Sequence, residues 1–140
     1  MTTTLNAVSG TGLVQTSDGS GVVKVQSNGV TTNALAWVEF AGSSGTINAS
    51  YNVSSITRNA AGDYTVNFTS ATTNIYYVPF ASCSPNSSLP ARLLPVMYTN
   101  AGGITTIAPT TSAFRFSCYN YPNAGTTYDP DYVMAGVFGN

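Results

Sequence analysis

The stretch that decides the fold runs from Ala36 to Phe68 and reads AWVEFAGSSGTINASYNVSSITRNAAGDYTVNF. Apolar side chains alternate there with polar ones, and the gaps between the alternating runs are rich in Gly, Asn, Ser and Asp. The alternation is clearest at the end, where Tyr64, Val66 and Phe68 point to one side and the residues between them to the other. Alternation with a period of two predicts strands that bury one face.

The same pattern occurs upstream, in residues 47–53, and a turn separates the two runs. Residues 58–63 hold the turn formers, because Gly62 can adopt positive φ without steric cost and Asn59 and Asp63 can bond their own backbone. We therefore predict a β-hairpin whose loop is longer than two residues.

Further strand-like runs follow, separated by turn residues. They are residues 75–81, 91–99, 104–107, 113–119 and 132–138. Pro79 cannot donate a hydrogen bond to a β-ladder, so it marks an edge strand or a bulge. We find no helical periodicity of useful length. The predicted fold class is all-β: an antiparallel β-sandwich, jelly-roll-like, with an extended N-terminal β-hairpin arm.

The chain divides into an arm, residues 1–33, and a β-sandwich knob, residues 34–140. The arm has two short strand-like runs and strong turn signals, but its apolar residues are too few to form a core. It packs either on its own domain or on a neighbouring subunit or the rest of a particle, and its polar, Gly-rich, terminal character favours the second. The apolar residues that would attach it are Leu13, Val14, Val22, Val23 and Val25.

The composition is poor in charge. Charged residues make up 6% of the chain, against about 25% in an ordinary soluble domain. Such a surface suits a protein covered by other chains or part of a robust extracellular shell. A net charge of −1 argues against nucleic-acid binding, which requires clustered Lys and Arg. No signal-peptide pattern and no apolar run of about 20 residues occurs, so we expect synthesis in a cytoplasm and no membrane insertion.

The sequence lacks the residues and motifs of most catalytic and metal-binding sites. The chain has no histidine, which excludes Ser-His-Asp and Cys-His catalysis and His-bearing zinc sites. No phosphate-binding or dinucleotide motif occurs. The close carboxylate pair Asp129–Pro130–Asp131 could bind Ca²⁺, but a solvated turn is favoured because Ca²⁺ needs about 6–8 oxygen ligands. We therefore expect a protein that is not an enzyme and has no cofactor or metal.

Two cysteines, Cys83 and Cys118, lack CxxC spacing. Because disulfides are rare in a cytoplasm, two buried and reduced thiols are the favoured interpretation. A disulfide formed after release from the cell is the alternative.

The residues best suited to recognition lie near the C-terminus. Tyr and Asn on loops suit adaptable binding, and aromatic rings suit sugar faces. This loop either contacts a receptor or glycan or packs against a sister subunit, and the sequence favours neither. Its candidate contact residues are Tyr119, Tyr121, Asn123, Tyr128 and Tyr132. Trp37, the only tryptophan, is expected to be buried, with sugar stacking as the alternative.

Three phrases carry a family resemblance: AWVEF at residues 36–40, YNVSSIT at 51–57 and GDYTVNFT at 62–69. Over roughly residues 13–69 the chain resembles a module of tailed bacteriophages, especially phages of cyanobacteria and other aquatic bacteria. That module is usually described as a tail-fibre or virion structural protein. The resemblance implies a part of a virion, assembled in the host cytoplasm.

The resemblance does not say which part of the virion this is. Among the parts of a phage, we expect a trimeric fibre or spike subunit, an expectation from phage architecture, with an outward-facing knob that is a candidate for contact with the host surface. A capsid decoration protein that clamps neighbouring capsid proteins is the alternative, and a stand-alone carbohydrate-binding module is a third. The expected partners are further copies of the chain, tail, baseplate or major capsid proteins, and a host cell-surface glycan.

Overall fold

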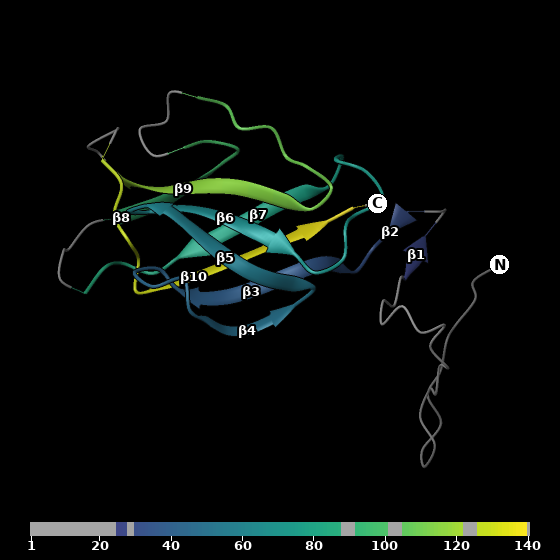
Figure 1. The fold of residues 1–140 in the computed structure, drawn as a ribbon, viewed down its shortest axis with the longest axis horizontal. Helices are drawn as coiled ribbons and strands as arrows, with labels where there is room; N and C mark the ends of the chain where they lie inside the picture. The colour runs from purple at the N-terminus through teal and green to yellow at the C-terminus, as the bar shows by residue number, and fades with distance from the viewer. Residues whose placement is uncertain (1–24, 28–29, 88–91, 101–104, 122–125, 140) are drawn as a thin grey trace, which may run out of the picture.

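A computed structural model describes residues 25–27, 30–87, 92–100, 105–121 and 126–139 (Figure 1). All of its regular elements are strands, ten in the described part of the chain. In chain order they are β1 (Gln26–Ser27), β2 (Val30–Thr31), β3 (Ala34–Ala41), β4 (Ile47–Tyr51), β5 (Val53–Ala60), β6 (Asp63–Phe68), β7 (Val78–Cys83), β8 (Arg92–Met97), β9 (Ala113–Tyr121) and β10 (Tyr132–Phe138).

The long strands form two four-stranded sheets with the orders β4-β3-β10-β7 and β5-β6-β9-β8. Every neighbouring pair is antiparallel. The two sheets pack face to face, which confirms the predicted β-sandwich (Figure 1). Pro79 lies in β7, at the edge of the first sheet, as its missing backbone N–H requires.

The predicted central hairpin differs from the observed one. β6 pairs with β5, whereas residues 47–51 form β4 and belong to the other sheet. The predicted loop length is wrong as well, because Ala60 pairs with Asp63 and leaves a two-residue turn of Ala61 and Gly62. Gly62 has a φ of 66°, which is the conformation the turn demands.

Asn52 is the point at which the chain changes sheet. Its φ of 54° is left-handed, a conformation that Asn tolerates better than most residues. The side-chain amide donates to the carbonyl oxygens of Leu35 and Ser70, and its oxygen accepts the backbone N–H of Ser70. These three bonds hold the bend between β4 and β5.

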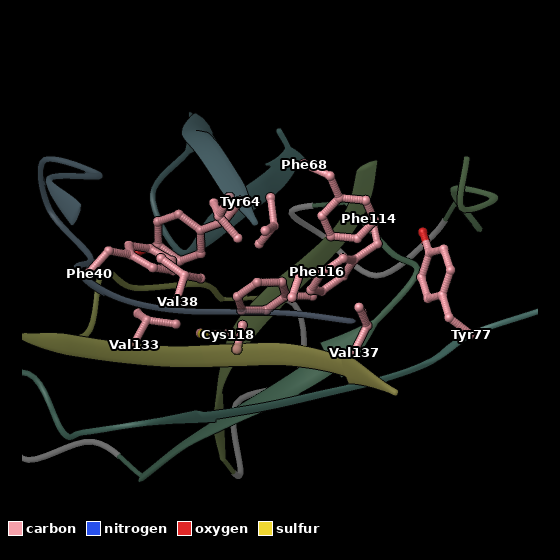
Figure 2. Packing of buried hydrophobic residues seen from close by; sticks show 14 residues of the cluster. Val38, Phe40, Tyr64, Phe68, Tyr77, Phe114, Phe116, Cys118, Val133 and Val137 are labelled. Atoms are coloured by element: carbon pink, nitrogen blue, oxygen red, sulfur yellow. The ribbon is translucent and has the colours of Figure 1, made fainter. Parts of the chain in front are cut away.

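The core between the sheets is built around a chain of aromatic rings (Figure 2). Phe40 from the first sheet meets Tyr64 from the second edge to face, with ring centroids 5.1 Å apart. Tyr64 in turn contacts Phe116, and Phe116 stacks on Phe114. Valines from β3, β6 and β10 fill the space around the rings. Close packing of large rings from both sheets fixes how the sheets face each other.

The N-terminal part of the described chain is a small hairpin in which β1 pairs with β2. Val25 precedes it and is 56% exposed, and its carbonyl accepts the backbone N–H of Thr32. The hairpin lies beyond the end of the sandwich, near the C-terminus (Figure 1). The other predicted attachment residues, Leu13, Val14, Val22 and Val23, lie outside the described residues.

Two of the shorter predicted strands differ from the structure. Residues 75–77 precede β7, which starts at Val78. Between residues 105 and 107, Thr106 forms an isolated bridge with Thr99 in place of a strand. Residues 75–77 lie in the connection from one sheet to the other, whereas residues 105–107 lie in the connection between β8 and β9 of the same sheet.

Candidate functional site

The outer surface of the β4-β3-β10-β7 sheet exposes large apolar side chains. Along β7 and β10 every second residue points outward, and apart from Ser82 and Gly136 these positions hold large apolar or aromatic residues where a solvated face would carry polar ones. We call this surface the aromatic face and define it as Trp37, Val78, Phe80, Tyr132, Met134 and Phe138, all exposed.

The strand register brings these residues together around Gly136. Gly136 pairs with Trp37 on one side and with Phe80 on the other, so the three share one row across the sheet. A Cβ atom on Gly136 would lie 2.6 Å from the Phe80 ring, which shows that the ring covers the glycine. Phe80 also stacks on Phe138, with ring centroids 5.4 Å apart. The glycine thus allows a flat aromatic surface to form.

The aromatic face matches in area the largest apolar patch of a typical monomer, and such a patch is often functional. Trp37, Phe80, Phe138 and Tyr132 are 42–54% exposed and together present roughly 400 Å² of ring surface, if each aromatic side chain has about 200 Å². Val78 and Met134 add to this. A patch of this size is typical of an interaction site.

Trp37 does not fill the buried position predicted for it. It is 42% exposed, whereas its neighbours Ala36 and Val38 are buried. Strand alternation forces this choice, because Phe40 and Val38 occupy the core and Trp37 must point the other way. The burial prediction is therefore wrong, and Trp37 belongs to the aromatic face.

Charge is sparse on this side of the sheet. Glu39 shares the outer face with Trp37, and its carboxylate accepts a 3.4 Å hydrogen bond from the Asn48 amide. Ala49 on β4 and Ser82 on β7 continue the same row as Glu39 and Met134. A nearly neutral surface with large rings matches the composition of interface cores, which are depleted in charged residues.

The outer surface formed by β5, β6 and β9 of the second sheet is mostly polar, with Val96 of β8 exposed beside it. We call it the polar face and define it as Ser55, Thr57, Asn59, Asp63, Thr65, Asn67 and Arg115. Its groups bond to one another: the Asn67 amide donates to the hydroxyls of Ser55 and Thr57.

The strongest contact on the polar face is an ion pair. Arg115 donates two hydrogen bonds of 2.8 and 2.7 Å to the two carboxylate oxygens of Asp63. The Asp63 side chain is only 1% exposed, and the Asn59 amide donates to one of its oxygens. The pair raises the pKa of Arg115, chiefly through the hydrogen bond to Asp63. A face that satisfies its own polar groups so fully has little left to offer a ligand.

A second polar cluster closes one end of the sandwich. We call it the latch and define it as Asp129 with Arg58, Gly62 and Tyr64. One Asp129 carboxylate oxygen accepts bonds from Arg58 Nε (3.0 Å), the Gly62 backbone N–H (2.9 Å) and the Tyr64 hydroxyl (2.8 Å). The other oxygen accepts Arg58 Nη2 at 2.7 Å. Burial alone would raise the pKa of Asp129, but the bonds from Arg58, Gly62 and Tyr64 outweigh it and lower that pKa.

The latch corrects the prediction of two acids on a solvated turn. Asp129 holds the β5–β6 turn, and the backbone N–H of Ser87 donates to the carboxylate of Asp131. Pro130 between them is fully buried. The Asp129–Asp131 segment is thus part of the scaffold. Within the described residues, no group of three or more potential metal-binding side chains occurs.

The structure describes three of the predicted contact residues in detail: Tyr119, Tyr128 and Tyr132. The Tyr119 hydroxyl donates to the Asn100 carbonyl at 2.6 Å, so this ring is held within the domain. The backbone of Tyr128 lies against Gly62, and Tyr132 belongs to the aromatic face. Tyr121 ends β9, and Asn123 lies outside the described residues. A bridge between Tyr119 and Thr127 keeps Tyr119 beside the segment that holds Tyr128, whereas Tyr132 lies on the aromatic face.

Sequence reasoning named Tyr132 but missed the other outward residues of β7 and β10 as a site. The available signal was that both strands carry apolar residues at successive positions, as in VPFA and YVMAGVF. What could not be read is the register that places Phe80 and Trp37 on either side of Gly136. Membrane crossing is not supported by any helix: none in the described part of the chain is long and apolar enough.

Comparison of the chain with protein-family models, with curated proteins and with solved structures gives no match in any of the three. The case for a function therefore rests on the residues themselves, and above all on the aromatic face.

Proposed function

We propose that this protein is a non-enzymatic structural subunit of a bacteriophage virion, and that it assembles with further copies of itself through the aromatic face. The observation that carries the proposal is the set of large rings left exposed on one side of an otherwise well-packed sandwich. The phage assignment rests on the sequence resemblance in residues 13–69. The low charge of the chain fits a subunit whose surface is covered in a larger assembly.

The physical reasoning is that burying the aromatic face releases water from apolar surface. At about 25 cal/mol per Å², roughly 400 Å² of ring surface favours association by about 10 kcal/mol per copy before the entropy cost of association is subtracted. A standard interface buries about 800 Å² on each partner, so the rings supply roughly half of one. Association in threes, as in phage fibres and spikes, would let each copy cover its neighbour.

Host contact through the segment between β9 and β10 has weaker support. Tyr119 is bonded to Asn100, and Asp129 is bonded within the latch, so both are already committed to the domain. A fibre or spike subunit remains the form of the proposal that we favour, and a capsid decoration protein uses the same face against neighbouring subunits.

The assembly part is tested by molar mass in solution, measured by light scattering on a sizing column. We expect the wild type to run at about three times the mass of the 14.5 kDa chain. Phe80→Lys places a charge in the centre of the aromatic face and should give a monomer. Thr57→Lys places the same charge on the polar face and should leave the oligomer intact. Circular dichroism of each variant confirms folding.

A wild type that stays monomeric at 100 µM, on the order of the highest concentrations used for weak association, would refute assembly through this face. Equal effects of the two lysines would refute the choice of face. The virion part is tested by quantitative mass spectrometry of purified particles. Hundreds of copies per particle would favour the decoration form, a few tens the fibre form, and complete absence would refute a virion role.

A further inference from the structure

Two cysteines from opposite sheets meet inside the sandwich. Cys83 ends β7, where alternation turns it inward with Ala81 against the core. Cys118 lies in β9 of the other sheet and is fully buried. The two thiols are hydrogen-bonded to each other and carry no disulfide. Figure 2 shows Cys118 among the inward side chains beside Val133, whose partner on β7 is Cys83.

The two thiols differ in reactivity. The hydrogen bond from Cys118 lowers the pKa of Cys83 and outweighs the effect of burial. The hydrogen bond to Cys83, together with burial, raises the pKa of Cys118. Cys83 is also only half-buried, so a small molecule can reach it. Cys83 is half-buried and Cys118 is buried, so Cys83 is the thiol that an oxidant from solvent meets first, and its thiolate is the reactive form.

We propose that Cys83 and Cys118 are an oxidation site at which a hydroperoxide, such as hydrogen peroxide, forms an inter-sheet disulfide. In the first step the Cys83 sulfur attacks one peroxide oxygen, the O–O bond breaks, and Cys83 becomes a sulfenic acid as one water leaves. In the second step the Cys118 sulfur attacks the Cys83 sulfur and the S–OH bond breaks. The Cys118 proton leaves with the hydroxide as a second water. Overall, two thiols lose two electrons and two protons, and the peroxide is reduced to water.

The bridge would join elements that no backbone pairing connects. Cys83 lies on β7, an edge strand that pairs only with β10 in its sheet. Cys118 lies on β9, an inner strand of the second sheet between β6 and β8. A disulfide would close the chain between residues 83 and 118 and restrict the unfolded state. Cytoplasmic reductants keep such thiols reduced, so the bridge forms only after the protein leaves that compartment. This proposal stands independently of the oligomeric state.

The test uses the full chain, purified in its reduced form. The protein is treated with increasing hydrogen peroxide, catalase stops the reaction, and free thiols are alkylated in denaturant. Trypsin cleaves after Arg58, Arg92 and Arg115, which places the cysteines in peptides 59–92 and 116–140. We expect these two peptides to appear as one disulfide-linked pair, with the intact protein lighter by two hydrogens.

Thermal unfolding provides the second readout. A loop of this length predicts a rise in Tm of about 10 °C, reversed by a thiol reductant. Cys83→Ala should fold, form no linked peptide pair and show no rise, and Cys118→Val is the matched buried control. Cys83 oxidised to sulfinic acid while Cys118 stays free would overturn the proposal. So would disulfide-linked dimers in place of the internal pair, or two thiols that stay fully alkylatable at millimolar peroxide.

Discussion

Replacing Asp129 with alanine should show how strongly the latch holds the sandwich closed. The carboxylate accepts hydrogen bonds from three residues of the second sheet and its turn: Arg58, Gly62 and Tyr64. Tyr64 is fully buried and at the centre of the aromatic core. Without Asp129, the Tyr64 hydroxyl and the Gly62 N–H lose their acceptor at a site where water has little access.

These contacts give the expected loss in the free energy of unfolding. A buried donor left without an acceptor costs about 1–3 kcal/mol, so the Tyr64 hydroxyl and the Gly62 N–H together account for about 3 kcal/mol. Arg58 is 36% exposed, so solvent replaces most of its bond and its share stays below about 1 kcal/mol. The total of about 3–4 kcal/mol corresponds to a fall in Tm of roughly 10 °C for a domain of this size.

The matched variant is Tyr64→Phe, which keeps the ring and removes the hydroxyl at a cost of about 1 kcal/mol. The double variant should be less destabilised than the sum of the two singles, with a coupling of about 1 kcal/mol. Urea unfolding followed by circular dichroism measures all four proteins. An Asp129→Ala protein within 0.5 kcal/mol of wild type, which is about the usual error of additivity, would refute the latch.

The latch also predicts a pH dependence. Its hydrogen bonds lower the pKa of Asp129 in the folded protein, so the folded state holds the carboxylate more strongly than the unfolded state does. This stabilisation is fully present above the unfolded pKa of about 3.9 and is lost as the pH falls through the lower folded value. The difference between wild type and Asp129→Ala should therefore shrink below about pH 4. A difference that stays constant from pH 7 to the acid transition contradicts the assignment.

Two pairs of substitutions probe the scaffold. Arg115→Gln removes the ion-pair partner of the buried Asp63 carboxylate and should lower the free energy of unfolding in urea by about 3–5 kcal/mol. Arg115→Lys keeps the charge and should cost less. Equal losses for the two variants would contradict the role of the bidentate geometry. Gly42→Ala would drive a Cβ into the carbonyl oxygen of Pro130 and should displace the latch. Gly45→Ala meets atoms no closer than 3.5 Å and should cost only about 1–2 kcal/mol for its positive φ. Similar Tm values for the two alanine variants would show that the approach at Gly42 is relaxed.

The strands themselves were largely predictable because period-two alternation is a local property. Residues 132–138 and 63–68 form strands with the predicted bounds, and Pro79 lies on an edge strand as expected. The change of sheet at Asn52 was not predictable, since the alternation runs through it without a break. Only the bonds of Asn52 to Leu35 and Ser70, distant in sequence, reveal the bend.

The candidate site could not be predicted for a related reason. Alternation shows that two faces exist but not which one is buried when both carry apolar residues, and β3 is such a strand. Packing decides which face of β3 is buried: Val38 and Phe40 fit the core, and Trp37 is left on the outer face. The Arg58–Asp129 ion pair joins residues 71 positions apart, so no local pattern indicates it.

The two outer faces of the sandwich, taken together, favour assembly through one side. On the polar face the side chains bond to each other, and Arg115 and Asp63 form an ion pair there. Such a face is stable in water without a partner. On the aromatic face, Phe80 and Phe138 stack but leave much of their rings in water, a cost that persists until another surface covers them. A domain whose polar face bonds its side chains to one another, yet carries exposed rings on the opposite sheet, fits our proposal that those rings are buried in an assembly.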